Sequence, residues 1–397
     1  MSITSTARSW IPGPRAWAIG VPFVFLLLFF MLPFLLVLKI SFAQSSMTVP
    51  PYMPLWGLED GKPVWLWTLE NYLTIFSDDI YLAAYINSVR VAFFTTLICL
   101  LIGYPTAWLI ARAKPLARNL LLMGIVLPFL LVLKISFAQS SMTVPPYMPL
   151  WGMEDGKPVW LWTVQNYLTI FSDDIYLSAY INSVRVAFFT TLICLLIGYP
   201  TAWLIARAKP LARNLLLMGI VLPFWTSYLV RVYSWIGILK DQGLANSLLL
   251  HLGWIDAPLR LMQNTLGLYI GMVYSYLPYM ILPLCAFLMK MDPRLPEAAR
   301  DLGATPWEVF FTVTLPLSLP GITAGSLLVF IPCVGEYVIP ELLGSSQDLM
   351  IGRVMWSDFF NSIDWPLAAA ATCLMVALLL LPMAWFQRLQ SRGGMAL

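Results

Sequence analysis

Two ionisable residues interrupt long apolar stretches of the chain. Glu336 lies in the run Leu317–Leu343, and Arg231 lies in the run Leu215–Leu239. A charge at mid-bilayer costs about 2.5–3.5 kcal/mol on insertion scales, so each residue needs a partner or a function. For Arg231 we favour a structural role, in which the guanidinium pairs with an acid or reaches outward to water.

Glu336 has two readings that stay open. Its carboxylate can attract an organic cation, and nearby aromatic rings can offset the hydration that the cation loses. Alternatively it forms a packing salt bridge or marks a helix end at the outer interface, since Pro332 and Pro340 interrupt the run. The candidate residues of a substrate path are Glu336, Tyr337, Tyr274 and Tyr276.

No set of residues typical of catalysis stands out. The chain contains no G-x-x-x-x-G-K-[ST] phosphate loop, no H-E-x-x-H and no Ser/His/Asp set, so it is expected not to be an enzyme and not to hydrolyse ATP itself. The single histidine, His251, falls in a predicted outer loop. The five cysteines fall in predicted spans, where they are ordinary small apolar residues. We expect no cofactor, no metal site and no disulfide framework.

The composition restricts the class of protein. Of 397 residues, 60% are hydrophobic and 11% are charged, and the mean hydropathy is +0.79. Soluble domains carry about 25% charged residues, so this chain cannot cover a water-facing surface. A net charge of +3 is also too small for a nucleic-acid binder. The chain is expected to be an all-α, polytopic membrane protein that lies in a lipid bilayer.

A long internal repeat dominates the organisation. Residues Leu32–Val126 recur as Leu127–Val221, an offset of 95 with 91 identical positions, and removing one unit leaves 302 residues. Repeats that define an old fold drift further apart than this, so we favour a recent duplication or an artefact over a functional two-repeat transporter. The four differences are Leu58/Met153, Leu69/Val164, Glu70/Gln165 and Ala83/Ser178.

Eight apolar segments reach the ~20 residues that a membrane-spanning helix needs, or six without the duplication. One is a hybrid that joins parts of two parent helices at Pro128. A cleaved signal peptide is the less favoured reading of the first, because its apolar run exceeds a signal peptide's ~7–15 residues. The predicted spans are Ala16–Leu38, Val91–Ala111, Leu120–Phe137, Val186–Ala206, Leu215–Leu239, Leu266–Met289, Leu317–Leu343 and Trp365–Phe386.

Charge asymmetry predicts that both termini are cytoplasmic. With the N-terminus inside, the inner segments hold 13 of the 23 basic residues and 4 of the 20 acidic ones. The inner side therefore carries +9 and the outer side −6, in the sense of the positive-inside rule. The outer loops are rich in tryptophan and tyrosine. These aromatic residues are typical of anchoring at the membrane interface, and a more specific alternative is that they dock an external solute-binding protein.

The inner loop 290–316 contains signals for two short helices. The first is predicted from about Pro293 to Leu302 and ends at Gly303, a good left-handed cap. The second has Thr305 as N-cap, Pro306 at its first position and Glu308 completing a capping box. We expect Pro316 to limit this second helix.

The spacing in this loop is Glu297-Ala298-Ala299, three residues, Gly303, nine residues, then Val313-x-Leu315-Pro316. It resembles the signature loop of binding-protein-dependent ABC importer permeases, with Val313 where the family usually has Ile. Two further stretches resemble that family, the second in its polyamine (putrescine/spermidine) branch; they are Asn87–Trp108, with its copy from Asn182, and Val334–Gly344.

The resemblance implies a type I ABC importer permease of the bacterial inner membrane, a non-catalytic subunit that imports putrescine or spermidine. It also implies the partners: ABC ATPase subunits, a second permease subunit and a periplasmic polyamine-binding protein. The helix Glu297–Gly303 would couple transport to the ATPase. The corresponding coupling-loop residues are Glu297, Ala298, Ala299, Gly303, Leu315 and Pro316.

The duplication leads to a prediction about domains. The copy 127–221 keeps its native connection to the rest of the chain, so residues 174–397 are expected to form the permease core, with the coupling loop at 290–316. Residues 1–126 would be a peripheral helix pair. The alternative function is a proton-coupled secondary transporter of organic cations, which would use intramembrane carboxylates but would need no docking helix.

Overall fold

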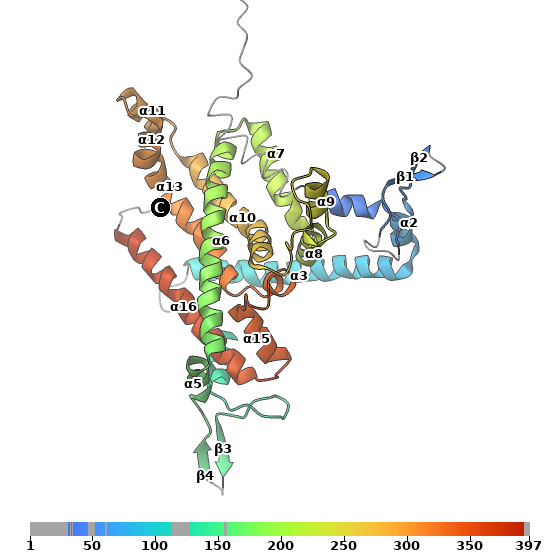
Figure 1. Cartoon of the computed structure of the whole chain (residues 1–397). Coiled ribbons are helices and arrows are strands. Elements are labelled where there is room, and N and C mark those ends of the chain that lie inside the picture. Colours follow the sequence, from blue (N-terminus) through green and yellow to red (C-terminus); the bar gives the residue numbers. More distant parts are fainter. Residues whose placement is uncertain are drawn as a thin grey trace, which may run out of the picture. The chain divides into compact units, whose positions relative to one another are not determined.

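The computed structural model describes residues 31, 33, 35–46, 52–59, 62–112, 128–154 and 157–392. These residues are mostly helical, and the chain divides into two compact units. One unit is Leu35–Thr163, and the other contains Val164–Leu397. The elements are labelled in Figure 1, and each unit is described by itself.

The unit Leu35–Thr163 contains two small hairpins from equivalent positions of the repeat. The first pairs β1 (Trp56–Glu59) with β2 (Lys62–Trp65), so that Trp56 faces Trp65 across the strands. The second pairs β3 (Trp151–Glu154) with β4 (Lys157–Trp160) in the same register. Neither hairpin was predicted from the sequence, although Asp-Gly between two short strands is a strong hairpin signal.

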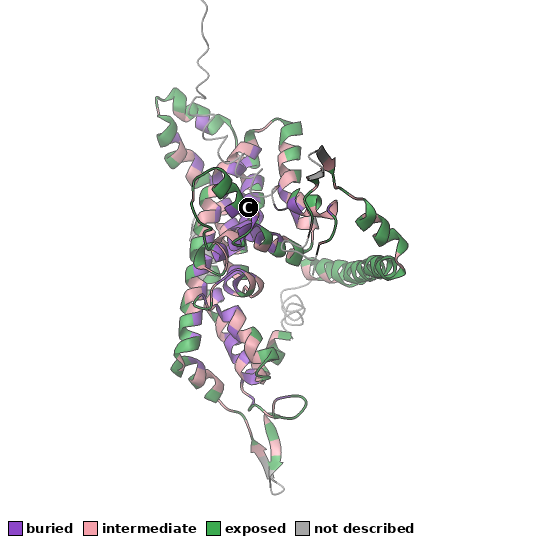
Figure 2. Cartoon of the chain, turned by 45° about the vertical axis from the view of Figure 1, so that its right-hand side comes forward, coloured by how far each residue is buried: buried purple, intermediate pink, exposed green. Residues whose placement is uncertain are grey.

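Two helices of the first copy follow the first hairpin. They are α2 (Glu70–Ser77) and α3 (Asp79–Arg112), and α3 is 34 residues long. None of the residues of α3 is buried, so that in Figure 2 the helix is green along most of its length.

The unit containing Val164–Leu397 is a bundle of helices, in which α6 is the second copy of α3 (Figure 1). A 3-10 turn (Leu222–Trp225) follows α7, and a π-helical turn (Phe310–Thr314) follows α12. The helices are α5 (Gln165–Ser172), α6 (Asp174–Arg207), α7 (Pro210–Val221), α8 (Tyr228–Leu239), α9 (Leu244–His251), α10 (Thr265–Lys290), α11 (Arg294–Asp301), α12 (Pro306–Val309), α13 (Leu315–Val334), α14 (Val338–Leu342), α15 (Ile351–Phe360) and α16 (Trp365–Arg392).

The core of this bundle lies where α6, α10 and α13 pack against one another (Figure 2). Glycines permit the close approach. A Cβ atom on Gly198 of α6 would lie 3.0 Å from Cγ of Met280, and one on Gly325 of α13 would lie 2.8 Å from Sδ of the same methionine. Small residues at such positions let membrane helices approach closely, where packing rather than water exclusion drives association.

Polar side chains of α6 fix it to α13, α15 and α16. The hydroxyl of Tyr199 lies 3.0 Å from that of Ser318, and the hydroxyl of Tyr180 donates to the carbonyl oxygen of Ala371 at 2.6 Å. At the start of α6, the hydroxyl of Tyr176 donates to Oδ2 of Asp358 at 2.7 Å. Buried hydroxyls are thereby satisfied inside the bundle.

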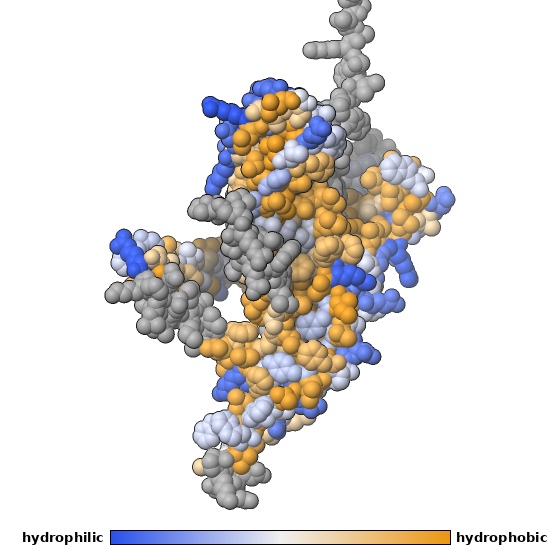
Figure 3. Space-filling model, turned by 90° about the vertical axis from the view of Figure 1, so that its left-hand side faces the viewer, coloured by the Kyte–Doolittle hydropathy of each residue, from blue (hydrophilic) through white to orange (hydrophobic). Residues whose placement is uncertain are grey.

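Four helices in the described residues are long and apolar enough to cross a membrane, and a bent pair would add a fifth. The four are α3, α6, α10 and the continuous helix Pro306–Val334. The predicted span Trp365–Phe386 falls within α16, whose apolar part Trp365–Leu380 is shorter. Figure 3 shows orange, hydrophobic side chains over much of the visible face, as expected of a surface that meets lipid.

The predicted span Leu215–Leu239 is not one straight helix. The segments Pro210–Phe224 and Tyr228–His251 meet at 92°. Pro223 lies in the 3-10 turn between α7 and α8, where a proline removes a backbone donor and ends the regular helix. The predicted span Ala16–Leu38 falls largely outside the described residues, and the first part of Leu120–Phe137, up to residue 127, falls outside them too. The total of eight spans and the cytoplasmic location of both termini stay predictions.

Candidate functional site: a tyrosine-bound carboxylate beside an aromatic cavity

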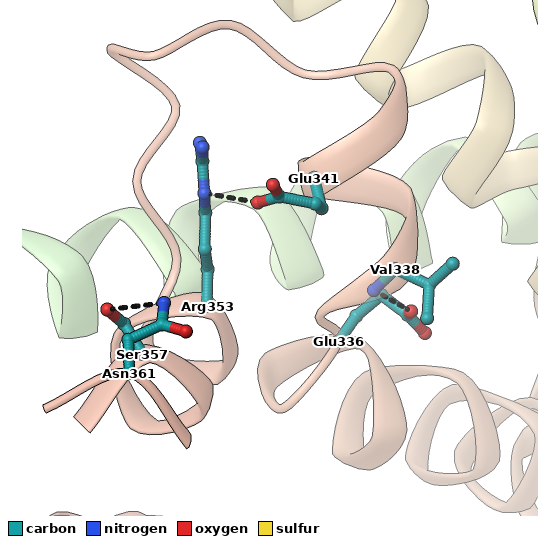
Figure 4. Close-up of polar contacts among 6 residues, drawn as sticks. All are labelled: Glu336, Val338, Glu341, Arg353, Ser357 and Asn361. Carbon is teal, nitrogen blue, oxygen red and sulfur yellow. Dashed lines mark hydrogen bonds and ion pairs between the residues drawn. The ribbon is translucent and has the colours of Figure 1, made fainter. Parts of the chain in front are cut away.

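Glu336 lies in the short break between α13 and α14. The helix α13 ends at Val334, so the predicted span Leu317–Leu343 is not one continuous helix. The carboxylate folds back onto the next turn, where Oε1 accepts a hydrogen bond of 3.0 Å from the backbone N–H of Val338 (Figure 4). Glu336 therefore satisfies a free donor at the start of α14.

Two tyrosine hydroxyls from other helices reach the same carboxylate. The hydroxyl of Tyr228, in α8, donates to Oε1 at 2.9 Å, and the hydroxyl of Tyr276, in α10, donates to Oε2. Three segments of the chain thus converge on one half-buried acid. Because a charge out of water is costly unless it is paired or hydrogen-bonded, these donors explain how the carboxylate is held there.

A cavity of about 480 Å³ lies against these tyrosines. Its aromatic and charged lining comes from the turn after α7, from α8 and from α10, while apolar residues of α13 and α16 complete the wall. Glu336 itself does not line it; the two tyrosines separate the carboxylate from the cavity. The lining residues that matter here are Phe224, Tyr228, Arg231, Ser275, Tyr276 and Tyr279.

Arg231 places its guanidinium over the aromatic wall. Its Cζ atom lies 4.4 Å from the ring centroid of Phe224 and 5.6 Å from that of Tyr228. Its Nε atom is buried without a hydrogen-bond partner. Among the described residues the recorded salt bridge joins Arg353 to Glu341 at 2.6 Å (Figure 4). Arg231 is not paired with an acid there, which leaves the other structural role expected for it, reaching outward to water, untested. Contact with aromatic faces takes the place of the acid.

The structure brings together only part of the aromatic set named from the sequence. Tyr276 binds Glu336, whereas Tyr274 is buried against Trp235 with ring centroids 5.4 Å apart. Tyr337 stacks on Trp356 at 4.5 Å and does not line the cavity.

Phe224, Tyr228 and Tyr279 were missed. The spacing of Phe224, Tyr228 and Arg231 would place them on one face of a helix, which is a usable signal. In the structure Phe224 lies in the 3-10 turn itself, before the helix that carries the other two. No described group of three or more His, Cys, Asp or Glu residues could hold a metal ion.

The inner loop forms the helix–turn–helix that its caps predict. The first helix, α11, ends at Asp301, and Gly303 adopts a φ of +89°, which a residue with a Cβ atom rarely adopts. Thr305 and Glu308 form the predicted capping box, with Pro306 at the first position of α12. Glu297, Ala298 and Gly303 are exposed, Ala299 is half-buried, and the neighbouring Leu302 is 90% exposed.

The expectation that Pro316 limits the second helix is wrong. The π-helical turn Phe310–Thr314 joins α12 to α13, so the helix continues from Pro306 to Val334. The N–H of Leu315 donates to the carbonyl oxygen of Phe310, five residues back. The next residue, Pro316, has no backbone N–H to donate. A widened turn of this kind accommodates a proline without ending the helix. Leu315 and Pro316 therefore lie in the first turn of α13.

Comparison with known proteins adds to this geometry. The family described as "Binding-protein-dependent transport system inner membrane component" matches residues 175–393. The chain is 39% identical over 261 residues to the spermidine/putrescine transport system permease protein PotB of Haemophilus influenzae, covering 66% of this chain and 87% of that protein.

The corresponding PotB of Escherichia coli K12 is 41% identical over 212 residues, which is 53% of this chain and 77% of that protein. Among solved structures, a bacterial ABC transporter involved in the import of the acidic polysaccharide alginate gives a TM-score of 0.49 at 16% identity, covering 77% of this chain and 98% of that one.

Proposed function

Because the chain belongs to the family of binding-protein-dependent transport system inner membrane components, we propose that it is the permease subunit of an ATP-driven polyamine importer. The observation that carries the substrate class is the 39% identity to a spermidine/putrescine permease over 87% of that protein's length. The secondary-transporter alternative has no such support.

The family description implies a multi-pass inner membrane protein that works with a binding protein. ABC ATPase subunits and an external, periplasmic polyamine-binding protein are the expected partners. A second permease subunit completes the proposed complex. In this chain residues 174–397 form the proposed core, and residues 1–126 form the proposed peripheral segment, with both termini cytoplasmic.

The inner loop is the proposed contact with the ATPase. Its support is a rigid, exposed helix–turn–helix, in which α11 presents Glu297 and Ala298 and ends at the left-handed Gly303. The side chains of Leu302 and Trp307 are 90% and 72% exposed, which provides apolar surface for a partner's groove. Leu315 and Pro316 lie in the first turn of α13, which continues from this docking element.

The substrate path is proposed to pass the cavity beside Glu336. An organic cation has a carboxylate behind two tyrosine hydroxyls and several ring faces available there. Of the residues named from the sequence, Glu336 and Tyr276 keep this role; Tyr228 is better placed than Tyr337 and Tyr274.

Uptake by the assembled transporter in proteoliposomes tests the function. Putrescine or spermidine should accumulate only when two conditions are met. ATP must be supplied on the side of the membrane that carries the ATPase subunits, and the binding protein must be present on the opposite side. A proton ionophore should leave this uptake unchanged. Uptake that follows a proton gradient without ATP would overturn the proposal in favour of the secondary transporter.

Two variants test the path. Glu336→Gln removes the charge at nearly unchanged size, although its amide nitrogen no longer accepts from one of the donors around Glu336. It should reduce kcat/KM for the polyamine about tenfold, which corresponds to about 1.4 kcal/mol. Glu341→Gln is the matched control, since Glu341 pairs with Arg353 and does not line the cavity. Equal effects of both variants, or no effect of Glu336→Gln, would remove Glu336 from the path.

Coupling is tested at Gly303. Proline cannot adopt the φ of +89°, so Gly303→Pro should leave ATP hydrolysis running while transport falls. Gly303→Asn is the control, because asparagine tolerates the left-handed region better than other residues with a side chain. Normal transport per ATP in Gly303→Pro would contradict the docking role.

A further inference from the structure

We infer that Arg231 is the contact point for a carboxylate on a membrane-spanning helix of the second permease subunit, and that this helix docks over the cavity that Arg231 lines. The inference deepens the proposed function, on which it rests for the presence of that subunit. Its basis is a positive charge in an apolar cavity that the described part of the chain does not neutralise.

The first step concerns the charge of the cavity. Among the described residues that line it, Arg231 is the charged one, and the rest of the wall is aromatic, apolar or hydroxyl-bearing. Arg231 forms no ion pair with any described residue, and its Nε is buried without a hydrogen bond. Its Cζ atom lies 4.4 Å from the ring centroid of Phe224 and 5.6 Å from that of Tyr228. Ring faces attract the guanidinium but do not cancel its charge.

The second step is that Glu336 does not serve as the counter-ion. Its side chain does not line the cavity, and its carboxylate accepts hydrogen bonds from the hydroxyls of Tyr228 and Tyr276 and from the N–H of Val338. Tyr228 contacts both charged groups, with its ring against the guanidinium and its hydroxyl on the acid. A buried charge without a paired partner is unfavourable, so a carboxylate from outside the chain would be stabilised beside Arg231.

The depth of the cavity selects the source of that carboxylate. Two of its lining residues lie midway along the apolar helix α10: Tyr276 is 11 residues after Thr265, and Tyr279 is 11 residues before Lys290. At 1.5 Å per residue, this is about 16 Å from either end of the helix. A lipid phosphate stays at the surface of a hydrocarbon core about 30 Å thick, so it does not reach this level. Acids at such depth belong to membrane-spanning helices, where they pair with bases.

The apolar part of the wall suits contact with a neighbouring helix. Leu327, Leu328 and Ile331 of α13 line the cavity, and positions three and four apart share one face of a helix. Leu328 is 50% exposed, and Tyr279 is 43% exposed. The volume of about 480 Å³ therefore receives side chains, one of them acidic, from a helix that lies across the opening.

The proposed complex has one component that can supply such a helix. The ATPase subunits lie on the inner side of the membrane and the binding protein lies outside it, which leaves the second permease subunit. Its docking also removes an obstacle to transport. A bare guanidinium repels a cation that passes the cavity, whereas a guanidinium paired with a carboxylate presents no net charge.

Photo-crosslinking in the complete transporter identifies the occupant while Arg231 stays in place. Benzoylphenylalanine replaces Tyr279, which lines the cavity, or Tyr233, which is 57% exposed on the same helix as Arg231 but does not line it. The probe at position 279 should form an adduct with the second permease, and the probe at position 233 should not. An adduct with a second copy of this chain, an adduct with lipid alone, or equal adducts from both positions would overturn the inference.

A charge exchange tests the carboxylate. Arg231→Glu places an acid where an acid is expected, and it should lower ATP-dependent uptake in proteoliposomes at least about tenfold. Each Asp or Glu in the membrane spans of the second permease is then changed to Arg in turn. One of these changes should restore uptake to within about threefold of the wild type. Arg231→Lys keeps the positive charge and should stay in the same range without any second change.

Arg353→Glu is the matched control. Arg353 pairs with Glu341 and does not line the cavity, so the change in the second permease that restores Arg231→Glu should not improve this variant. A merely structural Arg231 predicts that no exchange restores uptake, and that result overturns the inference. Equal improvement of both variants overturns it too.

The outcomes separate this inference from the proposed function. A transporter that contains both permeases and imports polyamine with ATP, but shows neither the adduct nor the rescue, overturns the inference alone. If the wild-type complex contains no second permease, the proposed complex itself fails and the inference fails with it.

Discussion

The repeat provides an internal control for the packing of α6. Gly198 in α6 and Gly103 in α3 have the same sequence neighbours, because the two helices differ only at Ala83/Ser178. A Cβ atom on Gly198 would lie 3.0 Å from Cγ of Met280 and 3.4 Å from Cγ1 of Ile281, whereas one on Gly103 meets nothing within 4 Å. The paired substitutions Gly198→Leu and Gly103→Leu therefore isolate tertiary packing from helix propensity.

The magnitude follows from this geometry. Both substitutions remove a glycine from a helix interior, which contributes about 0.8–1 kcal/mol in favour of each helix in aqueous peptides. That gain is common to the two variants and cancels in their difference. Only Gly198→Leu inserts four carbons into a contact already at its limit, and overpacking of this kind costs about 1–3 kcal/mol. For a unit of this size, that is about 3–9 °C in the unfolding midpoint.

The assay is the thermal unfolding midpoint of the detergent-solubilised chain, measured by loss of the monodisperse peak in size-exclusion chromatography. Gly198→Leu should unfold at a lower temperature than the wild type, and Gly103→Leu at the same or a slightly higher one. If Gly103→Leu is the more damaging substitution, or if the two midpoints coincide, the packing of α10 against the second copy is not what holds the bundle together.

Burial raises the pKa of Asp358, and the hydroxyl of Tyr176 opposes this shift. The pKa of this carboxyl is thus higher in the folded chain than the ordinary value of about 3.9. The resulting stabilisation is fully present below about pH 3.9 and is lost as the pH rises through the folded-state pKa. The thermal unfolding midpoint should therefore fall as the pH rises through this range in the wild type, and fall less in Asp358→Asn. Tyr176→Phe removes the opposing hydrogen bond and should extend the fall to higher pH. The equivalent substitution in the first copy of the repeat, Tyr81→Phe, should not. Thr305→Ala removes one side of the capping box with Glu308, about 1 kcal/mol, and should speed hydrogen exchange in the first turn of α12 about fivefold.

Local signals in the sequence predict local structure well. The end of α11 just before Gly303 and the role of Thr305 as N-cap of α12 are confirmed, because caps depend on a few adjacent residues. The breaks within apolar runs were harder to locate. Pro223 and Gly335 mark real breaks, but Pro316 lies in a continuous helix, since a π-helical turn further back accommodates it.

Tertiary contacts were predicted least well. From the sequence, Arg231 needed a partner, but only the fold shows that the partners are Phe224 and Tyr228. Tyr276 and Tyr274 are two residues apart, yet one binds Glu336 and the other packs on Trp235. Helices α3 and α6 make the limit clearest: their sequences are almost the same, and only one has buried residues. Burial is decided by what the rest of the chain offers, which no local pattern contains.

The helix capped by Thr305 also connects the inner loop to the candidate site. Its 29 residues from Pro306 to Val334 run without interruption from the inner loop to the residue that precedes Gly335 and Glu336. At 1.5 Å per residue this is a rod of about 43 Å. A displacement of α12 at the inner loop would be carried along this helix to the break at Gly335, where the carboxylate of Glu336 and its tyrosines lie. The π-helical turn is the place where such a rod has the least regular hydrogen bonding, and so it is where the rod would bend first.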